Sequence, residues 1–347
     1  MSSSPAAVGS EAPRAAPASG AAVWARGLTK RFGPVLALDH VSFDVAHGEL
    51  FGFIGPDGGG KATLFRLLVS LFTPDEGESR VLGLDPVADL WALRRQVGYM
   101  PARFSLYPDL TVLENLTFYA SVFGTTVERE MATIEPIWRQ IAPFSGRRAD
   151  ALSGGMKQKL ALCCALVHSP GILFLDEPTT GVDAVSRKEF WDLLARLREG
   201  GLTILVSTPY MDEASRCDRV ALVQRGRILR IDTPAAVSAS YPRPLLSVRG
   251  ADRLGMLAAL RAHPHAASVW PFGATLHFTD DRAGADSAAL ATELAAWLAA
   301  KQLRADVAPI DASIEDAFIF EMNREAGAEA GRSAEAGAGR KAGAGTQ

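Results

Sequence analysis

The fold is decided by one glycine-rich stretch, which reads Gly55-Pro56-Asp57-Gly58-Gly59-Gly60-Lys61-Ala62-Thr63. It nearly completes the phosphate-binding pattern G-x-x-x-x-G-K-[ST]. In such a loop the glycines let backbone N–H groups close around phosphate oxygens, and Lys61 would reach the β- and γ-phosphates. The next position should carry a hydroxyl for Mg²⁺, and Ala62 has none. The stretch therefore predicts nucleotide binding and leaves hydrolysis in question.

The residues on either side of this loop predict a strand before it and a helix after it. Residues 50–54 form an apolar run that leads directly into the glycines. The leucines after the loop recur at i, i+3, i+4 and i+7, which is the apolar stripe of a helix. They are Leu64, Leu67, Leu68 and Leu71. A phosphate loop requires this order of strand, loop and helix, whereas a plain glycine-rich turn does not.

Buried apolar strands alternate with helices along residues 23–240. The expected elements are strands 41–45, 172–175 and 203–207, a mostly helical stretch 104–168, a helix 184–199, and a hairpin of 220–223 with 228–231. This alternation is typical of a parallel sheet that helices cover on both faces. We therefore expect an α/β fold for this part of the chain.

A second, smaller domain is expected over residues 241–324. Its elements are strands 245–249, 267–271, 274–279 and 304–309, and helices 251–262, 286–302 and 313–323. The order βαββαβ predicts a small α+β sandwich of the split-βαβ type.

Composition bounds the class of protein. The chain has 347 residues and a net charge of −3, with 48% hydrophobic residues, so it has room for two domains and no overall basic field for nucleic acid. It contains no run of 18 apolar residues, and we expect no membrane span and a cytoplasmic location. The Ala/Gly-rich ends, 1–22 and 325–347, predict disordered tails.

The three cysteines predict neither a disulfide framework nor a metal site. Cys163 and Cys164 are adjacent in an apolar helical stretch, and Cys217 is distant in sequence. Their spacing matches no metal-binding pattern, so core packing is the expected role.

Two carboxylates follow an apolar strand at residues 172–175. Asp176 would hold Mg²⁺, mainly through water, and Glu177 would polarise the attacking water. A solvated Asp-Glu pair at a strand end is the alternative. The phosphate loop in the same chain favours the catalytic interpretation.

A serine and two glycines begin the next predicted helix. Ser153 is a natural N-cap, and Gly154 and Gly155 expose backbone donors. The segment 152–158 resembles the signature motif of ATP-binding cassette proteins. The segment 175–183 resembles their Walker B strand, catalytic glutamate and D-loop. The resemblance covers about residues 23–235.

Further segments are similar to the ATPase subunits of multidrug-type exporters. They are 98–101, 104–112 and 207–214, and the unit 240–323 resembles the accessory C-terminal domain that such subunits often carry. The fold implied is a P-loop NTPase cassette, a parallel core sheet with a helical subdomain. Phe32 matches the position that stacks on adenine, with a buried strand-end Phe as the alternative.

The resemblance implies ATP and Mg²⁺ as cofactors and a head-to-tail dimer with a second ATP-binding domain. It also implies an integral membrane permease as partner, met near Arg103 and Phe104, and a peripheral position on the inner face of the membrane. No nucleic acid is expected. The resemblance assigns ATP contacts to Phe32, Gly55, Pro56, Asp57, Gly58, Gly59, Gly60, Lys61, Ala62, Thr63, Ser153, Gly154, Gly155 and Asp183, Mg²⁺ to Asp176, and catalysis to Glu177.

Three positions depart from the family pattern. Ala62 replaces the Ser or Thr that binds Mg²⁺, Ala102 replaces the glutamine after Tyr-Met-Pro, and Pro209 replaces the histidine that contacts the γ-phosphate. Each loss removes an interaction aimed at the transferring phosphoryl group, and one such donor is worth about 10²–10³ in rate. The signature motif, which would serve the ATP of the other domain, is intact.

Three hypotheses follow for function. The first is the ATPase subunit of an exporter. The second is a non-hydrolysing regulatory or structural subunit whose signature motif completes the active site of a partner. The third is a soluble cassette protein that acts on ribosomes or DNA; those relatives usually carry two cassettes or a long coiled-coil insertion, and neither appears here. Self-pairing and pairing with an unlike domain both remain open, and so does the transported substrate.

Overall fold

The computed structural model describes residues 20–325 of the chain. These residues divide into two compact units, one made of 20–51, 58–207 and 225–227, the other of 52–57, 208–224 and 228–325. The predicted tails, 1–22 and 325–347, lie almost entirely outside the described residues. The predicted domain limits, 23–240 and 241–324, stay predictions.

An antiparallel sheet comes first in the chain. It consists of β1 (Ala21–Phe32), β2 (Val35–Ala46) and β4 (Glu76–Val81), in the order β2-β1-β4. From the sequence we expected only one strand here, at 41–45. The missed strand β1 pairs with β2 through several register shifts, which interrupt the alternation of apolar and polar side chains that marks a strand.

The predicted parallel sheet is confirmed. Strands β5 (Val97–Met100), β6 (Ile172–Asp176) and β7 (Thr203–Thr208) pair in parallel. The sheet continues through β3 (Leu50–Ile54), β8 (Arg219–Gln224) and β9 (Arg227–Asp232), in the order β5-β6-β7-β3-β8-β9. Every residue of β6 and β7 is buried, as expected for strands covered on both faces.

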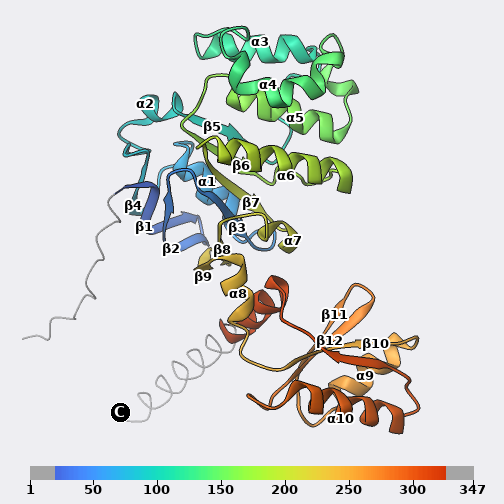
Figure 1. The fold of residues 1–347 in the computed structure, drawn as a ribbon. Coiled ribbons are helices and arrows are strands. Elements are labelled where there is room, and N and C mark those ends of the chain that lie inside the picture. The colour runs from blue at the N-terminus through green and yellow to red at the C-terminus, as the bar shows by residue number, and fades with distance from the viewer. Residues whose placement is uncertain (1–19, 326–347) are drawn as a thin grey trace, which may run out of the picture. The chain divides into compact units, whose positions relative to one another are not determined.

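Helices make up much of the rest of the cassette part. They are α1 (Lys61–Leu68), α2 (Leu90–Arg94), α3 (Val112–Val122), α4 (Met131–Ile141), α5 (Gly154–Leu166), α6 (Ala184–Glu199), α7 (Met211–Ala214) and α8 (Pro234–Ala239). Figure 1 shows α3, α4 and α5 gathered as a helical layer, as expected for 104–168. One prediction was too long: α1 ends at Leu68, because Ser70 adopts a left-handed φ of 62°, and Leu71 lies beyond the helix with half of its surface exposed.

The small C-terminal part has the predicted order βαββαβ. Its elements are β10 (Leu245–Arg249), α9 (Arg253–Arg261), β11 (Ala266–Phe272), β12 (Thr275–Asp280), α10 (Ser287–Ala300) and β13 (Asp306–Pro309), followed by helical residues 314–325. The sheet order is β11-β12-β10-β13 (Figure 1). One face of this sheet packs on α9 and α10 and forms a separate apolar core.

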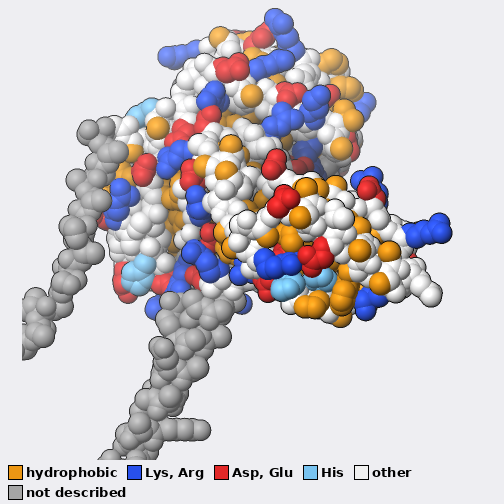
Figure 2. Space-filling model, turned by 60° about the horizontal axis from the view of Figure 1, so that its bottom comes forward, with side chains coloured by type: hydrophobic (Ala, Val, Ile, Leu, Met, Phe, Trp, Pro, Cys, Tyr) orange, Lys and Arg blue, Asp and Glu red, His pale blue; other side chains and the backbone are white. Residues whose placement is uncertain are grey.

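The surface charges and the cysteine positions match what the composition predicts. Basic and acidic side chains are interspersed over the face shown in Figure 2. None of the helices within residues 20–325 combines the length and the apolar character that crossing a bilayer requires. Cys163, Cys164 and Cys217 are free thiols in buried positions, and burial raises the pKa of Cys163 and of Cys164.

Candidate functional site

The end of the phosphate loop requires a glycine. Gly60 is the N-cap of α1 and has a φ of 103°, which L side chains rarely adopt. A Cβ added here would lie 2.7 Å from the backbone oxygen of Ala37 and 3.0 Å from Leu38 Cδ2. The loop therefore passes close to β2 and opens directly into the N-terminus of α1, where unpaired N–H groups favour an anion.

The beginning of the loop is equally tight. A Cβ on Gly55 would lie 2.0 Å from the backbone oxygen of Val223. The N–H of Gly55 donates to the backbone oxygen of Thr208 at 3.3 Å. Backbone packing therefore explains the first glycine of the pattern as well as the last.

Asp176 lies at the end of β6, opposite Ser207 at the end of β7. The Ser207 hydroxyl donates to Asp176 Oδ1 at 2.5 Å, and Asp176 as a residue is 1% exposed. Burial raises the pKa of Asp176. The Ser207 hydrogen bond and the positive charges of Arg66 and Lys61 act to lower this pKa but do not outweigh the burial. Lys61 is itself buried at the start of α1.

The second oxygen of this carboxylate suits a cation. Asp176 Oδ2 is buried and has no hydrogen-bond partner among the described residues. A buried, unpaired carboxylate oxygen is costly unless something positive satisfies it. Mg²⁺, or a water bound to it, would do so, and oxygen is the ligand that Mg²⁺ prefers. The residues present therefore fit the ion.

Glu177 is held in an uncommon backbone conformation beside Asp176. Its φ is 49°, in the left-handed region. Its N–H donates to the backbone oxygen of Ser207 at 3.0 Å and to the Ser207 hydroxyl at 3.2 Å. Thr180 donates to Glu177 Oε2 at 3.3 Å. Such strain costs about 1–3 kcal/mol and persists where surrounding contacts impose it.

The signature residues form a second group around the starts of two helices. Ser153 caps α5 and accepts from Met156 N–H at 3.4 Å. Asp183 caps α6 by accepting hydrogen bonds from the N–H groups of Val185 and Ser186. The hydrogen bond from the Ser186 N–H contributes most to lowering the pKa of Asp183. A Cβ on Gly155 would lie 2.6 Å from Ser186, so the two helix starts touch only because residue 155 is glycine.

Phe32 ends β1 with 43% of its surface exposed. The buried strand-end alternative is therefore wrong. Its ring meets Phe72 edge-on at 5.5 Å, and Lys30 Nζ lies 5.6 Å from its centroid. An exposed aromatic ring that neighbouring side chains hold in place can stack on a flat base.

This geometry agrees with comparisons to known proteins. A family model described as ABC transporter matches residues 38–180. Nod factor export ATP-binding protein I of Mesorhizobium japonicum is 36% identical over 266 residues, which are 75% of this chain and 77% of that protein. The chain belongs to this family of ABC transporter ATP-binding proteins.

Other relatives place the cassette in the same family. The probable multidrug ABC transporter ATP-binding protein YbhF of Escherichia coli is 45% identical over 215 residues. The match covers 60% of this chain but only 37% of the length of YbhF. A solved ATP-binding subunit of an ABC transporter has a TM-score of 0.58 and 26% identity, and covers 63% of this chain and 92% of its own. A dimeric ATP-binding cassette solved with ADP and Pi has a TM-score of 0.55 and 26% identity to this chain. The match covers 61% of this chain and 98% of the cassette.

The three departures from the family pattern all lie at ends of elements. Ala62 is the second residue of α1, Ala102 is exposed two residues after β5, and Pro209 directly follows β7. None offers a side-chain donor or ligand, and Pro209 also lacks an N–H. Thr63, one position beyond Ala62, is the nearest hydroxyl in the helix.

Sequence reasoning assigned no role to Ser207 or Arg66. Ser207 holds both the Asp176 carboxylate and the Glu177 backbone, and Arg66 contributes positive charge toward Asp176. Ser207 could have been found, because the carboxyl ends of neighbouring parallel strands meet at one edge of a sheet. The position of Arg66 depends on the packing of α1 and had no comparable signal.

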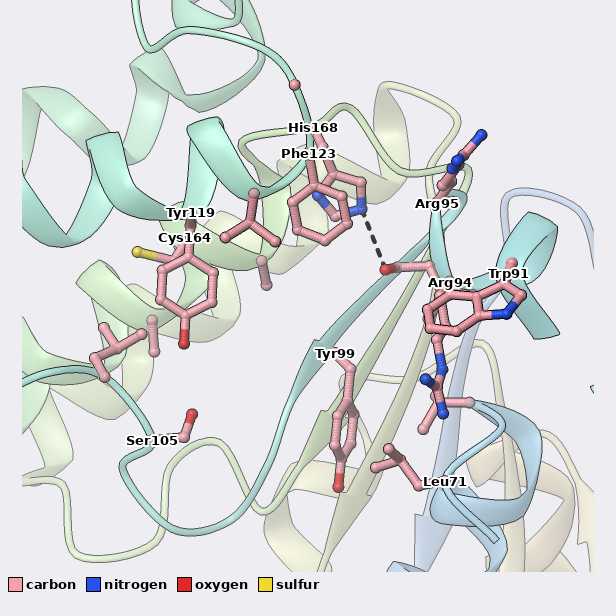
Figure 3. Close-up of a pocket in the computed structure, with 17 residues that line it drawn as sticks. Leu71, Trp91, Arg94, Arg95, Tyr99, Ser105, Tyr119, Phe123, Cys164 and His168 are labelled. Carbon is pink, nitrogen blue, oxygen red and sulfur yellow. Dashed lines mark hydrogen bonds between the residues drawn. The ribbon is translucent and has the colours of Figure 1, made fainter. Parts of the chain in front are cut away.

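A cavity of about 820 Å³ lies beside the helical layer. Its wall combines aromatic, basic and apolar side chains from α2, α3, α5 and β5, including Trp91, Arg95 and Tyr99 (Figure 3). His168 stacks on Phe123 at 3.7 Å and donates from Nε2 to the Val97 oxygen at 3.2 Å. Burial lowers the pKa of His168, which favours its neutral form.

Proposed function

We propose that this cassette is the ATP-binding subunit of an ABC-type export complex, in which ATP-driven dimer closure moves an integral membrane permease. One observation carries the proposal: Ser207 holds Asp176 and Glu177 together at the ends of β6 and β7, and the charge of Lys61 acts on the same carboxylate. Relatives named for multidrug and Nod factor export support the direction of transport.

The positions of the side chains support the following roles in ATP binding and hydrolysis. Phe32 stacks on adenine, and Lys61 with the loop N–H groups holds the phosphates. Asp176 would hold Mg²⁺, and the ion would supply positive charge that neutralises the phosphate oxygens. Glu177 polarises the attacking water.

The signature group contacts a second nucleotide. In a head-to-tail dimer, Ser153 and the N–H groups of Gly154 and Gly155 bind the ATP held by the other domain, with Asp183 beside the same interface. The exposure of Ser153 in the single chain supports this role. Helix N-termini attract phosphate for the reason that applies to α1.

The cavity beside the helical layer is the proposed docking place of the permease. Its mixture of aromatic and apolar side chains with the exposed Arg95 suits a permease segment with apolar side chains and an acidic residue. Arg103 and Phe104 are exposed nearby in sequence and extend this surface. Docking there would hold the subunit on the inner face of the membrane.

The test is the ATPase rate of the purified chain alone, with its permease, and with any second ATPase subunit. The proposal expects ATP binding by the chain alone and faster turnover in the assembled complex. Copurification with ribosomes or DNA in place of a membrane protein would contradict it.

A second candidate is a regulatory subunit with a weak hydrolytic site of its own. Ala62, Ala102 and Pro209 favour it, because all three losses affect this domain's own nucleotide while the signature group is intact. Ser153→Ala in the assembled complex tests this candidate, which expects a large loss of turnover. Unchanged turnover would rule out the supporting role.

A further inference from the structure

The C-terminal part contains a second pocket, of about 300 Å³, which none of the nucleotide-binding residues lines. It lies where helical residues 314–325 meet the sheet face opposite the apolar core. Its lining comes from the segment that enters the domain, from β11 and β12, and from that helix. Three separate segments of chain therefore converge on one cavity, at the lower end of the size range of small-molecule sites.

One wall of this pocket is a fixed hydrogen-bond chain. His277 Nδ1 donates to Asp316 Oδ1 at 2.8 Å, and the two side chains are only 13% and 5% exposed. Ser313 donates to Asp316 Oδ2 from its N–H at 2.9 Å and its hydroxyl at 2.6 Å. The His277 ring also stacks on Phe272 at 4.0 Å. These contacts fix the imidazole, and its Nε2 has no hydrogen-bond partner within residues 20–325.

The charge of the pocket favours an anion. Both oxygens of Asp316 already accept hydrogen bonds, so its carboxylate is not free for a cation. Burial acts to raise the pKa of Asp316, but the hydrogen bonds from His277 and Ser313 outweigh it and hold this pKa below its usual value. Arg243 is half-buried in the lining and makes no ion pair within the described chain, and Arg324 pairs only with Glu321.

The apolar part of the pocket is aromatic. Trp270, directly opposite His277 across β11 and β12, keeps 39% of its surface exposed. Tyr241 and Phe320 meet edge-to-face at 5.5 Å, and the Tyr241 hydroxyl is occupied by Thr279 at 2.6 Å. An exposed indole and fixed ring edges suit a flat apolar group better than a flexible polar one.

We propose that this pocket binds a small organic anion that carries an aromatic or other flat apolar group. Arg243 pairs with the acid group, His277 Nε2 hydrogen-bonds to it, and Trp270 stacks on the flat part. The bound molecule bridges the entering segment, the sheet and residues 314–325, so it stabilises the C-terminal part of the chain. This site is independent of ATP.

The test uses the full chain and three naphthalene probes of one size. Calorimetric titration compares 2-naphthoate and 2-naphthyl phosphate with uncharged 2-naphthalenemethanol. We expect at least one of the two anions to bind saturably, and at least about tenfold more tightly than the alcohol, because only the anion forms a charge-assisted hydrogen bond with Arg243. The proposal would be overturned by the wild-type protein alone if neither anion bound saturably, or if anion and alcohol bound with equal affinity.

A matched pair of variants then locates the acid group. Arg243→Met keeps the apolar stem and removes the charge, and should weaken binding of the anion about tenfold or more. Arg261→Met removes an exposed arginine at the end of α9, outside the pocket, and should change nothing. Equal affinity of the two variants, with unchanged circular dichroism, would overturn the assignment.

Discussion

The residues proposed to act on nucleotide lie in two regions, which differ in the groups that they retain. Around the phosphate loop the backbone geometry, Lys61 and Asp176 are present, but Ala62 lacks the hydroxyl expected for Mg²⁺. Around the signature motif both helix caps and the close approach at Gly155 are intact. Binding and turnover can therefore be affected separately in one fold, because backbone N–H groups bind phosphate while side chains stabilise the transition state.

The largest expected effect comes from breaking the intact region. Gly155→Val would force a side chain into Ser186 and displace the start of α5 from α6. Losing donors aimed at the transferring phosphate costs about 10²–10³ in rate. We expect that loss in the ATPase rate of the assembled complex. Gly146→Val is the control, since a Cβ at Gly146 meets nothing within 4 Å; equal rates for the two variants would show that the signature contact does not matter.

The second largest effect is expected on ATP affinity and tests whether the phosphate loop binds the nucleotide. Lys61→Ala removes the buried charge next to the phosphates and should raise the ATP dissociation constant about 10–100-fold, the equivalent of one or two charge-assisted hydrogen bonds. Lys188→Ala, on the exposed side of α6, should bind ATP as the wild type does. Equilibrium dialysis with labelled ATP measures both. A wild-type affinity in Lys61→Ala would contradict the assignment.

A smaller effect is expected at the adenine end. Phe32→Ala should weaken ATP binding about 2–10-fold, because aromatic stacking contributes about 0.5–1.5 kcal/mol. Binding of inorganic tripolyphosphate, which has no base, should not change. The control is Phe104→Ala, an exposed aromatic outside the loop. If tripolyphosphate binding falls as much as ATP binding, Phe32 acts on the loop and not on the base.

The smallest effect concerns stability and pH. Burial raises the pKa of Asp176 in the folded chain, so ionising it costs folding free energy above that raised pKa and costs nothing below the ordinary value of 3.8. Asp176→Asn should therefore raise Tm without nucleotide at pH 7, and in a domain of 150–250 residues each kcal/mol gained shifts Tm by roughly 2–4 °C.

This gain should shrink as the pH falls toward 3.8. Asp306→Asn, exposed in β13, should show no pH-dependent difference from wild type. Calorimetry without nucleotide across this pH range measures both variants. A gain of Asp176→Asn that is the same at every pH would show that the buried charge is not its cause.

Much of the fold could be predicted from the sequence because apolar runs and glycine positions report local structure directly. The loop, the parallel strands and the βαββαβ order were all visible in this way. Strand β1 was not, because its register shifts obscure the alternation, and the end of α1 was not, because it depends on one left-handed residue at Ser70.

The residues of the candidate site can be named from the sequence, but their contacts cannot. Sequence order places Asp176 and Glu177 at a strand end, yet only the register of β6 against β7 brings Ser207 to both. The unpaired second oxygen of Asp176 is likewise a property of three-dimensional burial. Such contacts between distant segments leave no local pattern in the chain.

We expect this phosphate loop to bind ATP although three side chains that would support hydrolysis are missing beside it. The most direct measurement compares single-turnover hydrolysis of Mg·ATP by the wild type and by the triple variant Ala62→Thr, Ala102→Gln, Pro209→His, each at saturating protein. We expect equal or similar ATP affinity and a hydrolysis rate at least about 10²-fold higher in the triple variant, which is the value of a single restored donor. A wild-type rate as high as that of the triple variant would contradict it.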